Sequence, residues 1–165
     1  KFVEPPKSVL ERIARDNRLI GAARARDTNE AWFADDFDWP VKGPLTGIYG
    51  SQRILNGVPK RPHFGVDIAV GQGTPIHAPV GAVVAMAEKD LYYTGGTMIL
   101  DHGRGVSTSY LHMSRLDAKV GDRVAKGDVI GAVGQTGRAT GPHLCWRLNW
   151  FHERLDPALV VPEMG

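Results

Sequence analysis

Short apolar runs separated by turns rich in glycine and aspartate fill the chain after Pro40. The runs cover residues 82–87, 97–100, 106–111 and 129–133. Glycine (20) and proline (11) together supply 31 of the 165 residues, about 19% where about 12% is average. Short strands with turns at regular intervals are typical of antiparallel sheets. The sequence therefore predicts an all-β body of the size of one domain, with no internal repeat.

The first 40 residues have a different character. Ser8 and Glu11 fit a capping box, and apolar residues on one helical face predict a single helix that ends at about Arg26. Residues 32–39 alternate aromatic and acidic side chains, which suggests a covering segment packed on the body. We therefore divide the chain into residues 1–40, helix and cover, and residues 41–165, the β body. The helical arginines are interpreted as a solvated face, with contact to an anionic envelope surface as the alternative.

Charge and composition exclude several classes of protein. The net charge is +2, but residues 1–26 hold seven Lys/Arg against three Asp/Glu, so the remaining residues carry a net −2. A body without a basic surface excludes an electrostatic nucleic-acid interface. The uncharged stretch 68–87 is broken by glycine and proline and cannot span a membrane. One cysteine excludes an internal disulfide. The chain opens on Lys1 without an apolar signal region, as expected of a mature or trimmed form.

Two pairs of side chains could carry metal chemistry. His63 and Asp67 would lie ~13 Å apart in an extended strand, too far to share a metal, so the chain must bend at Gly65. Alone, this pair also fits a surface histidine and a capping aspartate. His143 and Cys145 alternate onto one strand face, and a thiolate is a good zinc ligand, although a structural cysteine fits as well. Arg147 and Asn149 share this polar face, where a structural role is favoured over ligand contact, whereas Leu144, Trp146, Leu148 and Trp150 face the core.

The remaining histidines differ in their surroundings. His112 ends an alternating run, and by itself could be any histidine at the end of a strand. His77, His102 and His152 are interpreted as structural.

The joint pattern of these residues resembles the lysostaphin-type zinc metallopeptidases. The resemblance covers roughly residues 43–157 and rests on motifs that occur in the family's order, namely His63-xxx-Asp67, Tyr110-Leu-His112 and Gly141-Pro142-His143-Leu-Cys145. It implies a mainly β fold, a small antiparallel sheet or barrel-sandwich hybrid with an open groove, and hydrolysis of peptide crosslinks in peptidoglycan. It also implies export to the periplasm or cell envelope.

The resemblance assigns roles to five residues. His63 and Asp67 correspond to the first two zinc ligands, and His112 and His143 to two catalytic histidines that do not bind the metal. Cys145 stands where the family has its third ligand, a histidine. If the thiolate binds Zn²⁺, three protein ligands and one open position remain, as a catalytic site requires. If it does not, the chain resembles degenerate members that regulate or activate other wall hydrolases, or bind the wall.

Charge counting distinguishes this site from the usual one. Two histidines and one aspartate leave Zn²⁺ with a formal charge of +1, whereas replacing one histidine by thiolate leaves zero. A neutral centre lowers the pKa of the attacking water less, so we expect an alkaline optimum. The groove wall is assigned to residues 49–62, with residues 88–96 as a second loop that shapes substrate choice. Residues 120–131 also resemble the hairpin of biotinyl and lipoyl carrier domains, but Ala85-Met86-Ala87-Glu88-Lys89 lacks their modified-lysine frame.

Overall fold

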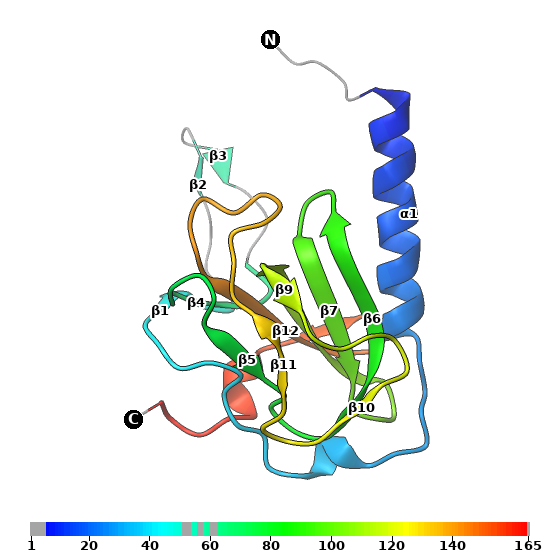
Figure 1. Cartoon of the computed structure of the whole chain (residues 1–165), viewed down its shortest axis with the longest axis vertical. Coiled ribbons are helices and arrows are strands. Elements are labelled where there is room, and N and C mark those ends of the chain that lie inside the picture. The colour runs from blue at the N-terminus through cyan, green and yellow to red at the C-terminus, as the bar shows by residue number, and fades with distance from the viewer. Residues whose placement is uncertain (1–5, 51–53, 56–57, 60–62, 165) are drawn as a thin grey trace.

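The computed structural model describes residues 6–50, 54–55, 58–59 and 63–164. Thirteen strands and one long helix fall in these ranges (Figure 1). The helical elements are α1 (Lys7–Arg24), η1 (Trp32–Ala34) and η2 (Pro157–Leu159). The strands are β1 (Leu45–Gly47), β2 (Ile54–Leu55), β3 (Val58–Pro59), β4 (Val66–Ile68), β5 (Pro75–His77), β6 (Ala82–Leu91), β7 (Gly95–Asp101), β8 (Val106–Met113), β9 (Arg115–Leu116), β10 (Arg123–Val124), β11 (Val129–Ala132), β12 (Leu144–Trp150) and β13 (Glu153–Leu155).

The predicted antiparallel β body is confirmed. The main sheet has the order β1-β4-β12-β8-β7-β6-β10, with β13 paired to β12, and a smaller sheet has the order β5-β11-β9. All of these pairings are antiparallel, and the described strands do not close into a barrel. This order places β4, β12 and β8 side by side, so residues distant in sequence meet on one face.

The larger hydrophobic core lies against the main sheet, and a smaller core cluster lies between the sheet and helix α1. Trp146 and Tyr110 are fully buried in the larger core, and the indole of Trp39 packs against that of Trp146 with ring centroids 5.8 Å apart. The Trp39 Nε1–H donates a hydrogen bond to the Pro162 carbonyl at 2.7 Å. The segment around Trp39 and the C-terminal segment therefore meet beside the core. The covering segment predicted at residues 32–39 thus contributes a core side chain.

The helix is present, but its predicted N-cap is wrong. Helix α1 begins at Lys7, Pro6 occupies the N-cap position, and no side chain caps the helix. Proline suits this position because it has no N–H to satisfy and its fixed φ leads into a helix. Ile13 and Ile20 are half-buried as predicted, whereas Leu10 is 49% exposed because only the later turns contact the sheet. No helix among the described residues is long and apolar enough to cross a membrane.

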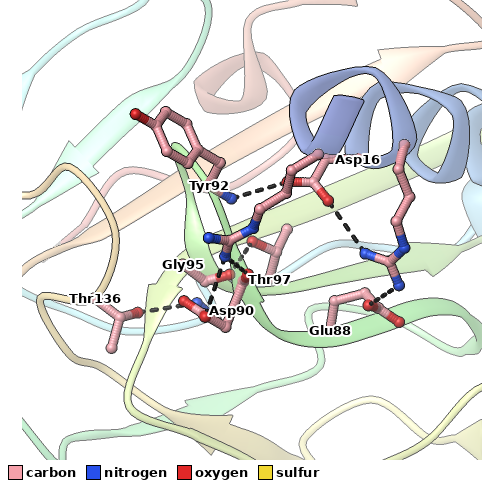
Figure 2. A network of polar contacts seen from close by, with 10 residues as sticks. Asp16, Glu88, Asp90, Tyr92, Gly95, Thr97 and Thr136 are labelled. Atoms are coloured by element: carbon pink, nitrogen blue, oxygen red, sulfur yellow. Dashed lines mark hydrogen bonds and ion pairs between the residues drawn. The ribbon is translucent and has the colours of Figure 1, made fainter. Parts of the chain in front are cut away.

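Polar contacts fix α1 against the β6–β7 hairpin (Figure 2). Asp16 is buried and accepts a hydrogen bond from the Tyr92 backbone N–H at 2.9 Å. Arg15 pairs with Glu88 at 3.2 Å. The predicted solvated arginine face is therefore correct only in part. Arg15 and Arg18 are exposed, but Arg12, Arg15 and Arg26 also pair with carboxylates of the β6–β7 hairpin.

Candidate metal centre

The three predicted ligands meet where β4 pairs with β12. Asp67 and Cys145 are directly opposite each other in the register of these strands. The His63 Nε2 lies 3.3 Å from the Asp67 Oδ1 and 3.9 Å from the Cys145 Sγ. One ligand atom from each of the three residues lies within 4.8 Å of the others. The structure therefore brings together the ligand set that the sequence predicted.

Gly65 allows the bend between His63 and Asp67. A Cβ at this position would lie 2.7 Å from the Trp146 carbonyl oxygen and 2.8 Å from the Arg147 Cγ. The strand β12 backbone passes too close for any side chain at residue 65. The 3.3 Å contact between His63 and Asp67 confirms the predicted bend, and the close approach of β12 explains why residue 65 is glycine.

The two predicted catalytic histidines lie beside these ligands. The ring centroids of His112 and His143 are 5.1 Å apart, and the His143 Nε2 lies 3.8 Å from the Asp67 Oδ1. His112 comes near the end of β8 with a φ of 63°, in the left-handed region that side chains other than glycine seldom adopt. All five predicted residues line one cavity of about 580 Å³.

Three imidazole rings in this cavity are oriented in the same way. The Nδ1 of His63, of His112 and of His143 lies within hydrogen-bond distance of a backbone carbonyl, at 3.4, 2.7 and 2.9 Å respectively. A carbonyl oxygen only accepts, so each Nδ1 carries a proton. In the neutral rings, Nε2 therefore keeps its lone pair for a metal ion or a proton. The carbonyls belong to Ile48, Thr136 and Gly141.

Charge at this point favours a cation. Hydrogen bonds to Asp67, and then to Cys145, raise the pKa of His63 to about 9. Burial raises the pKa of Asp67, but its contacts with His63 and the charge of His143 bring that pKa below its usual value. Burial is also the main reason that the pKa of His112 is lowered. One nitrogen, one carboxylate and one sulfur form a donor set that suits Zn²⁺ and leaves a position open to the cavity.

Sequence reasoning missed part of the cavity wall. Arg138 and Arg154 line it, and the guanidinium of Arg154 lies 5.1 Å from the Phe64 ring centroid. Arg154 belongs to no recognisable motif, and Arg138 occupies a variable position shortly before Gly141, so neither could be assigned to the site from the sequence. Arg147, predicted on the same strand face as Cys145, also lines the cavity. Most of the groove wall assigned to residues 49–62 lies outside the described residues.

The strand-face prediction for β12 is correct for most of the strand. Leu144, Trp146 and Leu148 are buried in the core as expected, but Trp150 is 51% exposed because the last residue of β12 extends beyond the core. The polar face is also covered, and Asn149 is only 1% exposed.

The histidines interpreted as structural do not line the cavity of the candidate metal centre. His102 is fully buried, with its Nδ1 2.9 Å from the Gly81 carbonyl and its Nε2 2.7 Å from the Thr108 hydroxyl. His77 contacts the Gly127 carbonyl at 3.0 Å, and His152 is exposed.

The fold and this donor set match a known class of hydrolase. Residues 61–157 match the sequence pattern of "Peptidase family M23". The chain therefore belongs to peptidase family M23, the lysostaphin-type family to which its motifs pointed.

Two named proteins are similar to this chain in sequence. The chain is 42% identical over 143 residues to an "Uncharacterized metalloprotease" of Haemophilus influenzae, covering 85% of this chain and 27% of that protein. It is also 42% identical over 98 residues to "Peptidoglycan DD-endopeptidase ShyA" of Vibrio cholerae, covering 58% of this chain and 23% of that protein. The chain thus spans about a quarter of the length of these relatives.

Solved structures agree with the fold. A putative peptidase M23 from Pseudomonas aeruginosa superposes with a TM-score of 0.81 at 37% identity, over 94% of this chain and 63% of that one. A zinc-containing peptidase from Vibrio cholerae gives a TM-score of 0.69 at 28% identity, over 74% of this chain and 39% of that one.

Proposed function

We propose that this chain is a zinc-dependent endopeptidase that hydrolyses peptide crosslinks of bacterial peptidoglycan. The observation that carries the proposal is the convergence of His63, Asp67 and Cys145 within 4.8 Å beside His112 and His143. The relative named as a peptidoglycan DD-endopeptidase supports the substrate class. A wall substrate implies a place in the periplasm or cell envelope.

The protein's own side chains divide the proton transfers between them. Zn²⁺ held by the three ligands would supply a Lewis acid for the scissile carbonyl and lower the pKa of the attacking water. His112 acts as the base, because its Nδ1–H is bonded to a carbonyl and burial keeps the ring neutral with Nε2 free. His143, whose Nε2 lies 3.8 Å from the Asp67 Oδ1, would act as the donor toward the developing oxyanion.

Cys145 is the residue on which activity depends most directly. Its Sγ is directed at the same point as the His63 Nε2, and only 3% of the residue is exposed. A buried thiol beside an imidazole and a carboxylate fits a metal ligand better than a packing residue. Bound zinc would also protect the thiol from oxidation in an oxidising compartment.

Digestion of purified sacculi tests the proposal. Zinc-loaded protein should release muropeptides that mass analysis identifies as products of crosslink cleavage, and chelated protein should release none. His112→Ala should keep its zinc but lose release, whereas His152→Ala, a histidine outside the cavity, should behave as the wild type. Zinc at stoichiometric level in neither wild type nor Cys145→Ser would refute the ligand assignment. A zinc-loaded wild type that releases nothing would indicate a regulator of other hydrolases.

A further inference from the structure

A second cavity, of about 400 Å³, lies between helix α1 and the main sheet. It is next to the metal centre, because Arg147 and Arg154 line both cavities. Arg24, in the last turn of α1, lines the second cavity as well. Three guanidinium groups from β12, β13 and α1 therefore surround one space that adjoins the candidate active site.

The strand geometry explains how these arginines come together. Arg147 lies two residues beyond Cys145 on the same face of β12, with its Cγ over Gly65. Asn149 follows on that face, and Arg154 is directly opposite it on β13. Ser109 of β8 is directly opposite Arg147. A continuous polar strip thus extends from the metal ligand Cys145 to the underside of α1.

Buried polar atoms on this strip have no hydrogen-bond partner in the described part of the chain. They are the Nε of Arg24 and of Arg147, the hydroxyls of Ser107 and Ser109, and the Asn149 Oδ1. Buried polar atoms are normally satisfied, so this cluster, in which every group except the Asn149 carbonyl oxygen can donate, needs an explanation. Arginine Nε–H groups and serine hydroxyls are donors that suit an oxyanion.

The positive charges of Arg24 and Arg147 are not balanced by a carboxylate in the described part of the chain. No described carboxylate lies within 4.0 Å of the guanidinium nitrogens of Arg24 or Arg147. Asp16 lines the same cavity, but it is bonded to the Tyr92 N–H and to Arg15. Burial, followed by the charges of Arg154 and Arg147, lowers the pKa of Arg24 to about 10. An anion in this space would relieve both the repulsion and the missing hydrogen bonds.

We propose that Arg24 and Arg147, with Arg154 beside them, bind a carboxylate group of the peptide whose bond is cut at the metal centre. The identity of the peptide rests on the proposed function, whereas carboxylate binding does not. Guanidinium groups recognise carboxylates through paired, charge-assisted hydrogen bonds. The site would therefore favour a crosslink that carries a free carboxylate on the side of the cut bond facing α1.

Nuclear magnetic resonance of the arginine Nε–H groups tests carboxylate binding directly. The zinc-loaded protein is titrated with acetyl-D-alanine and, as a neutral match, with acetyl-D-alaninamide. We expect the Arg24 and Arg147 signals to shift with the carboxylate only, with at least about tenfold weaker binding of the amide, since a hydrogen bond to a charged group contributes about that factor.

Variants of one helix provide the controls. Arg24→Gln should weaken carboxylate binding about tenfold, Arg24→Lys should retain part of it, and Arg18→Gln, the same change at an exposed position of α1, should leave it unchanged. Thermal unfolding of each variant identifies a folding defect, and Arg24→Lys then carries the test. Equal responses to acid and amide, or no response, overturn the site.

Sacculus digestion is measured in parallel. Digestion without carboxylate binding refutes only this site, and binding without digestion refutes only the proposed function.

Discussion

Cys145 is a single residue that sets the charge of the candidate metal centre. Cys145→His should give the centre one more positive charge and lower the pKa of the attacking water. Each unit by which that pKa falls raises the ionised fraction at neutral pH about tenfold. We therefore expect faster release of muropeptides at pH 7 and an optimum at lower pH than in the wild type. Zinc content is measured in both proteins, and an unchanged pH profile at equal occupancy would contradict the prediction.

His102 is a buried histidine whose titration should affect folding. Burial lowers its pKa to about 4 from an unfolded value near 6.5. Between these values the unfolded chain binds more protons, so stability falls as the pH drops below about 6.5, by about 1.4 kcal/mol per pH unit. His102→Asn should therefore lose about 2 kcal/mol less than the wild type between pH 7 and pH 5. Urea unfolding of chelated protein at both pH values measures this, and equal losses would refute the assignment.

The sequence predicted individual site residues better than their orientations. Alternation along residues 143–149 correctly placed Cys145 and Arg147 on one face, and the motifs selected His63, His112 and His143, which line the same cavity. The hydrogen bonds that orient the three rings were not predictable, because two of the carbonyls come from the distant Ile48 and Thr136. The carbonyl partner of His143 is only two residues away, but its position depends on the conformation of the loop before β12.

Helix α1 is an element whose docking includes a part-buried hydrogen bond from the Tyr92 N–H to Asp16. Asp16→Ala would leave the half-buried Tyr92 without the acceptor for its N–H, at a cost of about 1–3 kcal/mol. Asp16→Asn keeps an acceptor and should cost less. Asp90 lies on the same hairpin as Tyr92, and Asp90→Ala removes only its exposed ion pair with Arg12 of α1. Such a pair contributes about 0–1 kcal/mol to stability. Urea unfolding compares the three variants, and an equal cost for Asp16→Ala and Asp90→Ala would contradict the prediction.

Elements were predicted from the sequence where periodicity and turns agreed. The runs at residues 82–87, 97–100 and 106–111 all lie within the long central strands. The helix start was misassigned because Pro6 and Ser8 both favour an N-terminus, and the side-chain signal was given more weight than the proline. Strand order could not be predicted, because pairing of β4 with β12 joins segments about eighty residues apart through contacts that local patterns do not encode.

At the scale of the whole molecule, the question is whether residues 41–165 fold without the N-terminal residues. Trp39, on the N-terminal side, is 7% exposed in the core, and loss of a core tryptophan typically costs about 3–5 kcal/mol. The total free energy of unfolding of a small domain is only about 5–15 kcal/mol. A fragment of residues 41–165 should therefore unfold at a much lower temperature than residues 6–165, or without a cooperative transition.

An intermediate fragment separates the two N-terminal elements. Residues 27–165 lack α1 but retain the covering segment, so this fragment should fold and yet be less stable, because Met86 and Ile99 lose the helix that packs against them. Thermal unfolding followed by circular dichroism ranks the three lengths. If residues 41–165 matched residues 6–165, the β body would be an independent domain. The expected order, with the largest loss between residues 27 and 40, would instead make the covering segment part of the same cooperative unit as the candidate metal centre.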